Sequence, residues 1–357
     1  VQHRADLTYV IGEMIAELNA GHAYVGGGDL PELKRIPTGL LGAELRRDPE
    51  TKYYQITRIL KGANWDRGMR SPLTEMGVDV SEKDYVIAVD GKPANEVNNL
   101  YELLVNTAGK QVTLKVNSKP EAKGARAVVV TPIDDESKLY YHDWVEGNVK
   151  KVSEATGGKV GYLHVPDMQV AGLNEFARHF YPQLAKKALI IDVRGNGGGN
   201  VSPMLIERLR REAAMVAISR NNQPTVEPDG TFNGPMVCLM NEFSASDGDI
   251  FPYRFRHYKL GPLIGKRSWG GVVGIRGSLP LVDGGYLNKP EFSRYDLEGK
   301  TWIMEGHGVD PDIVVDNDPA REFAGTDDQL NKGIEVILER LKKEEKKLPE
   351  VPPYPKR

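Results

Sequence analysis

Two apolar runs of strand length constrain what this chain can fold into. Residues 188–193 and 235–240 each end in a polar turn rich in glycine, serine or carboxylates, and a helix-like segment follows each turn. Other strand-like and helix-like stretches alternate with them from residue 160 to residue 264. This β-α-β alternation predicts an α/β unit whose sheet contains parallel pairs and is covered by helices.

A separate β-rich unit is predicted from Gly39 to about Pro132. Its strand-like stretches are residues 40–45, 53–59, 84–89, 111–116 and 127–131, and residues 98–108 show helical spacing. At roughly 95 residues, it is long enough for one small domain. Amphipathic helices are expected at residues 5–18 and 326–347. The proline-rich tail after them cannot continue a helix.

Composition argues against several classes of protein. The 357 residues carry a net charge of −3 without a basic stripe, so no nucleic-acid partner is expected. No apolar run reaches the 18 or so residues of a membrane span. His, Cys and carboxylates form no cluster at metal-ligand spacing, so we expect no metal and no other cofactor. The single cysteine, Cys238, lies in an apolar run and is expected to pack as a small hydrophobe.

The polar turn after residue 240 has two interpretations. Ser244 and Ser246 lie between a strand and a helix, where unpaired backbone N–H groups face a hydroxyl. The serine is either a helix cap or a nucleophile beside an oxyanion site. The turn Gly-Asn-Gly-Gly-Gly at 195–199 lacks the Gly-Lys-Ser/Thr of a phosphate loop, which leaves an oxyanion loop or a plain tight turn. In a parallel sheet both turns would share one edge.

A serine nucleophile needs a base within hydrogen-bonding reach. Of the seven histidines, His164 falls in a strand and His179 in a helix, while His257 lies about three turns beyond Ser246. His22 and His307 lie in glycine-flanked loops, and carboxylates surround His307. Spacing alone leaves both as candidates for the base.

Several ordered motifs together resemble the catalytic half of the tricorn proteases, relatives of the C-terminal processing peptidases. The resemblance covers nearly the whole chain. The matching motifs are Gly-His-Ala-Tyr-Val (21–25), Gly-Leu-Leu-Gly-Ala (39–43), Asp-Val-Arg-Gly-Asn-Gly-Gly-Gly-Asn (192–200), Asn-Glu-Phe-Ser-Ala-Ser-Asp-Gly-Asp (241–249), Ser-Trp-Gly-Gly-Val-Val (268–273) and Glu-Gly-His-Gly-Val-Asp-Pro-Asp (305–312).

The resemblance implies a role for each site residue. Ser246 is expected to be the nucleophile, His22 the general base and Glu305 the residue that orients it. The backbone N–H groups of Gly199 and Asp247 would form the oxyanion hole. The β-rich unit would be a PDZ domain whose loop holds a peptide carboxylate, through Gly39, Leu40, Leu41 and Gly42, while the peptide adds a strand.

Two departures from the family pattern are visible. Processing peptidases use a Ser–Lys dyad, but Gly271 stands at the lysine position and Lys266 lies outside it. The tricorn-type histidine is therefore the expected base. Tricorn proteases also carry a serine just before that histidine, linking it to the glutamate, whereas this chain has Gly21. The link would then be direct, through water, or through another hydroxyl such as that of Ser244.

The expected function is that of a serine peptidase which hydrolyses oligopeptides or fragments of unfolded proteins through an acyl-enzyme. An alternative, motivated by Gly21, is a peptide-binding PDZ module with a weakened or inactive peptidase site. A third possibility is acyl-thioester chemistry, since the expected layout of the catalytic domain, a mixed sheet with helices, resembles crotonase enzymes. The PDZ insertion and the Ser-Asp turn argue against this third possibility.

The resemblance also implies partners and an organisation. Family members assemble as hexamers, so self-association is expected, and location would be cytoplasmic, with a periplasmic one left open. The chain begins at Val1 without a signal-peptide pattern, which suggests a fragment without the family's N-terminal β-propeller domains. The expected segments are residues 1–37, which carry the base, a PDZ-like domain at 38–135, the peptidase domain at 136–347 and the tail at 348–357.

Overall fold

A computed structural model describes residues 1–353, and residues 354–357 of the expected tail lie outside the described part. The chain divides into two compact units. One joins Val1–Pro31 to the chain from Asn148 onward, and the other is Glu32–Gly147. None of the helices in residues 1–353 combines the length and the hydropathy needed to cross a bilayer.

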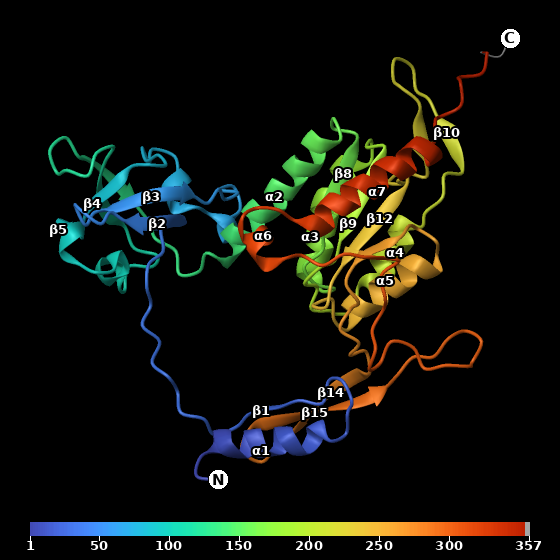
Figure 1. Ribbon diagram of the computed structural model, residues 1–357, viewed down its shortest axis with the longest axis horizontal. Coiled ribbons are helices and arrows are strands. Elements are labelled where there is room, and N and C mark those ends of the chain that lie inside the picture. Colours follow the sequence, from blue (N-terminus) through green and yellow to red (C-terminus); the bar gives the residue numbers. More distant parts are fainter. Residues whose placement is uncertain (354–357) are drawn as a thin grey trace. The chain divides into compact units, whose positions relative to one another are not determined.

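The first unit is built on a five-stranded parallel sheet with the strand order β16-β13-β12-β9-β8 (Figure 1). Its strands are β8 (Val160–His164), β9 (Ala188–Asp192), β12 (Met236–Met240), β13 (Leu263–Gly265) and β16 (Ile313–Val314). Every residue of β8, β9, β12 and β13 is buried, as the uninterrupted apolar runs predict for a sheet covered on both faces. The predicted parallel pairing is confirmed.

Helices cover this sheet. α7 (Asp328–Glu344) contacts β9, β12 and β13, and α3 (Val170–Phe180) contacts β8 (Figure 1). α4 (Ser202–Leu209) and α5 (Asp247–His257) pack on each other, and α5 also contacts β12. One apolar cluster fills the space between these layers, with Phe176, Phe180, Phe251 and Phe255 among its largest side chains. Short elements complete this part of the unit: β10 (Met215–Ala217), β11 (Thr225–Glu227) and α6 (Pro319–Phe323).

A second sheet of this unit holds the segment that carries His22. β1 (Val25–Gly27) pairs antiparallel with β15 (Gly285–Phe292), which pairs with β14 (Gly274–Pro280). α1 (Arg4–Ala16) contacts β1 (Figure 1). The helix forms where its periodicity predicts, but none of its residues is buried. Apolar side chains remain exposed along it and just beyond its end, at Leu7, Val10, Met14 and Leu18.

The second unit is an antiparallel sheet with the order β2-β3-β4-β6-β7 and a short β5 beside β4. The strands are β2 (Ala43–Arg47), β3 (Tyr54–Ile59), β4 (Tyr85–Val89), β5 (Lys92–Pro93), β6 (Val112–Asn117) and β7 (Arg126–Val130). The helix expected at 98–108 is a shorter 3-10 turn, η4 (Leu100–Leu104), which buries Leu100 and Leu104 in this unit's own core. Three other 3-10 turns connect its strands (Arg67–Met69, Pro72–Thr74 and Ala94–Glu96).

Two substantial elements were not expected from the sequence. The helix α2 (Ser137–Ala155) begins just after the β-rich unit, and the hairpin of β14 and β15 lies between the two motifs at 268–273 and 305–312. In α2 a buried polar residue, Asn148, stands among the buried apolar positions Leu139, Val145 and Val152. This polar residue interrupts the apolar periodicity that would have revealed the helix.

Candidate active site

Ser246 stands where β12 turns into α5, and its backbone is strained. It occupies the N-cap position of the helix with φ 57° and ψ −118°, a conformation that costs a non-glycine residue about 1–3 kcal/mol. Its side chain makes no capping hydrogen bond. The serine thus has the position of a cap without the contact of one, which leaves its hydroxyl available for other chemistry.

The neighbouring Ser244 has a structural role instead. Its side chain is fully buried, and its Oγ donates to the carbonyl of Val193 at 2.8 Å while it accepts from the N–H of Asn241 at 3.1 Å. The hydroxyl therefore ties the turn after β12 to the end of β9. Because both of these partners are backbone groups of the turns, Ser244 does not serve as the suggested link between the base and the glutamate.

The glycine-rich turn at 195–199 lies directly beside Ser246, as a shared sheet edge predicts. The N–H of Ala245 donates to the carbonyl of Asn196 at 2.8 Å. A Cβ built on Gly198 would lie 2.6 Å from the Cβ of Ser246, and one built on Gly199 would lie 2.0 Å from the carbonyl oxygen of Met168. Only glycines allow this approach. No hydrogen bond found within residues 1–353 uses the N–H of Gly199 or of Asp247.

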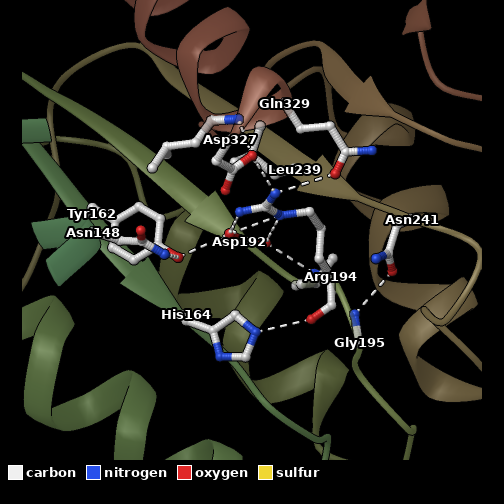
Figure 2. Close-up of polar contacts among 12 residues, drawn as sticks. Asn148, Tyr162, His164, Asp192, Arg194, Gly195, Leu239, Asn241, Asp327 and Gln329 are labelled. Carbon is white, nitrogen blue, oxygen red and sulfur yellow. Dashed lines mark hydrogen bonds and ion pairs between the residues drawn. The ribbon is translucent and has the colours of Figure 1, made fainter. Parts of the chain in front are cut away.

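A buried polar network holds the start of this turn in place. Arg194, which is 7% exposed, binds Asp192 with Nε and Nη2 and Asp327 with Nη1 at 2.8 Å (Figure 2). Its carbonyl accepts from Nε2 of His164 at 2.9 Å. The N–H of Gly195 donates to Oδ1 of Asn241 at 2.9 Å (Figure 2). The network fixes the end of β9 on both sides, so the turn beside Ser246 starts from a rigid point.

His22 and Ser246 line one cavity of about 630 Å³, together with Gly199 and Asp247. His22 is half-buried, in a left-handed backbone conformation with φ 63°. Burial lowers the pKa of its imidazole, and the charge of Glu305 opposes that shift. The ring is therefore neutral at pH 7, as a general base must be. Nδ1 is buried and makes no hydrogen bond within residues 1–353.

Glu305 acts on the backbone around His22. Its Oε1 accepts from the N–H of Gly21 at 2.7 Å, and its Oε2 accepts from the N–H groups of Val272 at 2.6 Å and Val273 at 2.7 Å. One carboxylate thus joins the residue before the histidine to the segment that faces it. The carboxylate thus contacts the main chain of Gly21, beside His22, and not the imidazole itself.

Gly271 has no room for a lysine. A Cβ at this position would lie 2.1 Å from the ring of Trp269, which itself packs edge-on against His22 with ring centroids 6.2 Å apart. Lys266 instead pairs with Glu242 at 2.7 Å and with Asp316 at 3.2 Å. No lysine therefore stands at the dyad position, and His22 stays the expected base.

The other candidate base, His307, belongs to a different environment. Its Nε2 lies 2.7 Å from Oδ2 of Asp310, and its side chain is 56% exposed. It does not line the cavity that holds Ser246.

Asp249 is a buried acid that sequence reasoning missed. It is fully buried in the first turn of α5, and its Oδ1 accepts from the N–H of Gly270 at 2.8 Å. Burial raises the pKa of its carboxyl to about 6, against the hydrogen bonds that lower it. An acidic residue in the first turn of a helix looks in sequence like a simple dipole partner, so the pattern gives no sign of its burial.

Comparison with known proteins identifies the family. Residues 159–315 match the model of peptidase family S41, and residues 39–135 match the tricorn protease PDZ domain. The chain is 40% identical to tricorn protease homolog 1 of Streptomyces coelicolor and 36% identical to the tricorn protease of Thermoplasma volcanium, over 96% and 97% of its own length. The crystal structure of the tricorn protease superposes on 96% of this chain with a TM-score of 0.89 at 33% identity.

The chain belongs to the tricorn protease family. It spans about a third of the length of these relatives, 32% and 33% of the two sequences and 33% of the chain in the crystal structure. The matched regions include the tricorn-type PDZ unit and the sheet that carries Ser246. The resemblance seen in the motifs is thus confirmed.

In this tricorn family member the residue before the expected base is glycine, and the structure shows what occupies the space of the missing side chain. A Cβ at Gly21 would lie 2.9 Å from Oε1 of Glu305 and 3.0 Å from the Cα of Gly271. The carboxylate occupies the space that a side chain would need. The backbone N–H of Gly21 makes the contact expected of a serine hydroxyl.

In the expected peptide loop of the tricorn-type PDZ domain, backbone N–H groups already donate to other groups of this chain. The N–H groups of Gly39 and Leu40 donate to the carbonyls of Leu104 at 2.8 Å and Ile133 at 2.7 Å. The N–H of Gly42 donates to Oε1 of Glu136 at 2.6 Å. Burial raises the pKa of Glu136, against the N–H groups of Gly42 and Ala43 that stabilise its charge. Part of the loop therefore already holds a carboxylate, that of Glu136.

Proposed function

We propose that this chain is a serine peptidase that hydrolyses oligopeptides or fragments of unfolded proteins through an acyl-enzyme. The observation that carries the proposal is the state of Ser246. It takes a strained N-cap position without a capping bond and shares a cavity with a half-buried histidine, in a chain of the tricorn protease family.

In the proposed reaction His22 removes the proton of Ser246 as Oγ attacks the peptide carbonyl. Negative charge then develops on the carbonyl oxygen, where the N–H groups of Gly199 and Asp247 would stabilise it. The C–N bond breaks as the imidazolium returns its proton to the leaving amine. Water, activated by the same histidine, hydrolyses the acyl-enzyme.

Glu305 is a positioning residue in this scheme. Its three backbone hydrogen bonds hold Gly21 against Val272 and Val273, so the loop that carries His22 keeps its place. Its charge also opposes the lowering of the His22 pKa and favours the imidazolium that forms during the reaction. These contacts answer the concern that Gly21 leaves the base unsupported, so an inactive site is not favoured.

Covalent labelling tests the proposal directly. A fluorophosphonate should add to Ser246, as located by peptide mass spectrometry, and the Ser246→Ala protein should remain unlabelled. A His22→Gln variant should label at least about 100-fold more slowly, because base catalysis contributes about 10²–10⁴-fold. Ser278→Ala, a change of an exposed serine in β14, serves as the control. Unlabelled wild-type protein after long incubation would reject the mechanism.

Self-association belongs to the same proposal. The family resemblance suggests a hexamer, and the exposed apolar residues Leu7, Val10, Met14 and Leu18 give this chain a surface that another copy could cover. Sedimentation velocity of the wild type and of a Val10→Glu, Met14→Glu variant tests this: the wild type should sediment as an oligomer and the variant as a smaller species. Identical monomeric sedimentation of both proteins would remove this part of the proposal.

The layout of the peptidase unit belongs to the same proposal. We propose a crotonase-like layout for the peptidase unit, supported by the position of the Gly199 and Asp247 donors at the sheet edge. The segments at 1–37, 38–135, 136–347 and 348–357 and the cytoplasmic location rest on the family resemblance. Recognition of a peptide carboxylate by Gly39, Leu40, Leu41 and Gly42 would require displacement of Glu136.

A further inference from the structure

Two arginines line the cavity that contains Ser246, and the proposed chemistry uses neither. Arg254 comes from α5, and Arg294 comes from the chain just after β15. Both are partly buried. Arginine side chains held at a cavity wall commonly recognise carboxylates or phosphates, since the guanidinium offers a fork of N–H donors. Because the cavity is the proposed peptide site, a role for these arginines in substrate binding rests on the proposed function.

Arg254 lies on the same helical face as the oxyanion donor. Asp247, Ile250 and Arg254 all line the cavity and are three and four residues apart, so this face of α5 forms one wall. Arg254 begins roughly 10 Å along the axis from Asp247. Its side chain reaches back, because Nη1 donates to Oγ of Ser202 at 2.5 Å and lies 3.8 Å from Oδ1 of Asp247.

Arg294 is held by the segment whose N–H groups contact Glu305. Its Nη1 donates to the carbonyl of Val272 at 2.9 Å, and its guanidinium carbon lies 5.3 Å from the centre of the Phe292 ring. Burial and the neighbouring charge of Arg254 lower the pKa of Arg294. The two cations line the same cavity and repel each other, and an anion bound by both would relieve that repulsion.

The charges lining the cavity do not balance. The carboxylate of Asp247 is the only acidic group among the described residues that line it, and both of its oxygens already accept from Ser202, at 2.5 Å and 2.9 Å. His22 is neutral, so two guanidinium groups face one engaged carboxylate. The hydrogen bonds found within residues 1–353 occupy one N–H of each guanidinium, out of five that each can donate.

We propose that Arg254 and Arg294 bind a carboxylate of the peptide substrate beside the bond that is cleaved. Because the guanidinium of Arg254 reaches back to within 3.8 Å of the Asp247 carboxylate, beside Ser246, and an extended peptide advances about 3.3 Å per residue, this carboxylate lies within roughly three residues of the scissile bond. The carboxylate comes either from an acidic side chain or from the free C-terminus of the peptide. Either source makes the same charge-assisted hydrogen bonds.

The test measures binding without turnover, in the full chain carrying Ser246→Ala. Three peptides of one sequence are compared by calorimetry. The first has a glutamate near the cleaved bond and an amidated C-terminus, the second has glutamine with a free C-terminus, and the third has glutamine with an amide. At least one of the two carboxylate peptides should bind about tenfold more tightly than the neutral one. The peptide that gains affinity identifies the source of the carboxylate.

Arginine variants in the same background locate the subsite. Arg294→Gln and Arg254→Gln should each remove most of the carboxylate preference and leave the affinity for the neutral peptide within about threefold, whereas Arg294→Lys should retain part of it. Arg220→Gln, which removes an exposed charge outside the cavity, should change nothing. Unchanged neutral-peptide binding shows that a variant is folded.

Equal affinity of the Ser246→Ala protein for all three peptides would overturn the inference without any arginine variant. A preference that survives both glutamine substitutions would overturn it as well. Wild-type protein that cleaves none of the peptides would refute the proposed peptidase function, while a carboxylate preference lost in the variants would still support the subsite.

Discussion

Replacement of Glu305 by glutamine tests how the base is held in place. The carboxylate accepts three backbone N–H groups, one on Oε1 from Gly21 and two on Oε2 from Val272 and Val273. Glutamine has nearly the same shape, but one of its two positions is an NH₂ group. If its oxygen faces the valines, that NH₂ meets the N–H of Gly21 as donor against donor.

The expected cost follows from these contacts. One charge-assisted hydrogen bond is lost and two become neutral, which together amount to about 2–4 kcal/mol. If this cost appears as displacement of the loop that carries His22, kcat/KM falls by about 30- to 1,000-fold. The charge of Glu305 raises the His22 pKa. Its removal lowers that pKa further, so the acid limb of kcat/KM should move to lower pH.

The assay is hydrolysis of a fluorogenic peptide between pH 4.5 and pH 8, with Tm recorded for each protein. Glu242→Gln is the matched control, because Glu242 makes a surface ion pair with Lys266; we expect kcat/KM within about twofold of wild type. A Glu305→Gln protein with kcat/KM within threefold of wild type and an unmoved acid limb would refute the reasoning. If kcat/KM of Glu305→Gln falls but the acid limb of its pH profile does not move, Glu305 positions the His22 loop without changing the pKa of His22.

Three further changes probe other contacts. Gly198→Ala should abolish activity, because its Cβ would lie 2.6 Å from that of Ser246. Gly195→Ala is the control: its φ is positive but no atom lies within 4 Å of its Cβ, so it should cost only about 1–2 kcal/mol of stability. Equal activity of the two variants would contradict this expectation. Asp249 has a pKa raised from 3.8 to about 6, so the stability that its protonated form contributes is lost as pH rises from 4 to 6, by an amount on the order of 3 kcal/mol. The free energy of unfolding of Asp249→Asn, measured in urea, should therefore rise relative to that of wild type between pH 4 and pH 6. A difference between the two free energies that stays constant from pH 4 to pH 8 would contradict the raised pKa of Asp249. Glu136→Ala should raise the affinity of the PDZ unit for peptides with a free C-terminus by at least about tenfold, measured by fluorescence anisotropy, and should not change its affinity for amidated peptides. If wild type binds the free C-terminus as tightly as the variant does, Glu136 does not block the loop.

The parallel sheet and the polar turns at its edge could be predicted because their signals are local. The apolar runs ending near Asp192 and Met240 predict buried strands. In any parallel sheet the polar turns that follow such strands lie at the same edge, where the strands end. The helix α2 gives a weaker signal, because Asn148 faces the core in order to donate to the Tyr162 hydroxyl at 3.1 Å. A buried polar side chain of this kind interrupts the apolar periodicity of the helix, although its hydrogen bond makes its burial favourable.

The support of the base could not be predicted from residue types. At position 21 the absence of a hydroxyl suggested a missing link, yet the link uses the main chain, which every residue possesses. The occupation of the Gly42 loop by Glu136 is equally invisible in sequence. Both cases depend on where a carboxylate finds unpaired N–H groups, and only the folded backbone determines that.

The order of the site residues along the chain has a consequence for biosynthesis. His22 precedes the inserted unit Glu32–Gly147, while Ser246 and Glu305 follow it. During translation the histidine therefore emerges long before its partners, and the loop that carries it lacks both β15 and the carboxylate that hold it. The proposed reaction therefore requires that residue 305 has left the ribosome and that these distant segments have met. The order of the segments along the chain thus keeps the proposed site incomplete until synthesis is nearly finished.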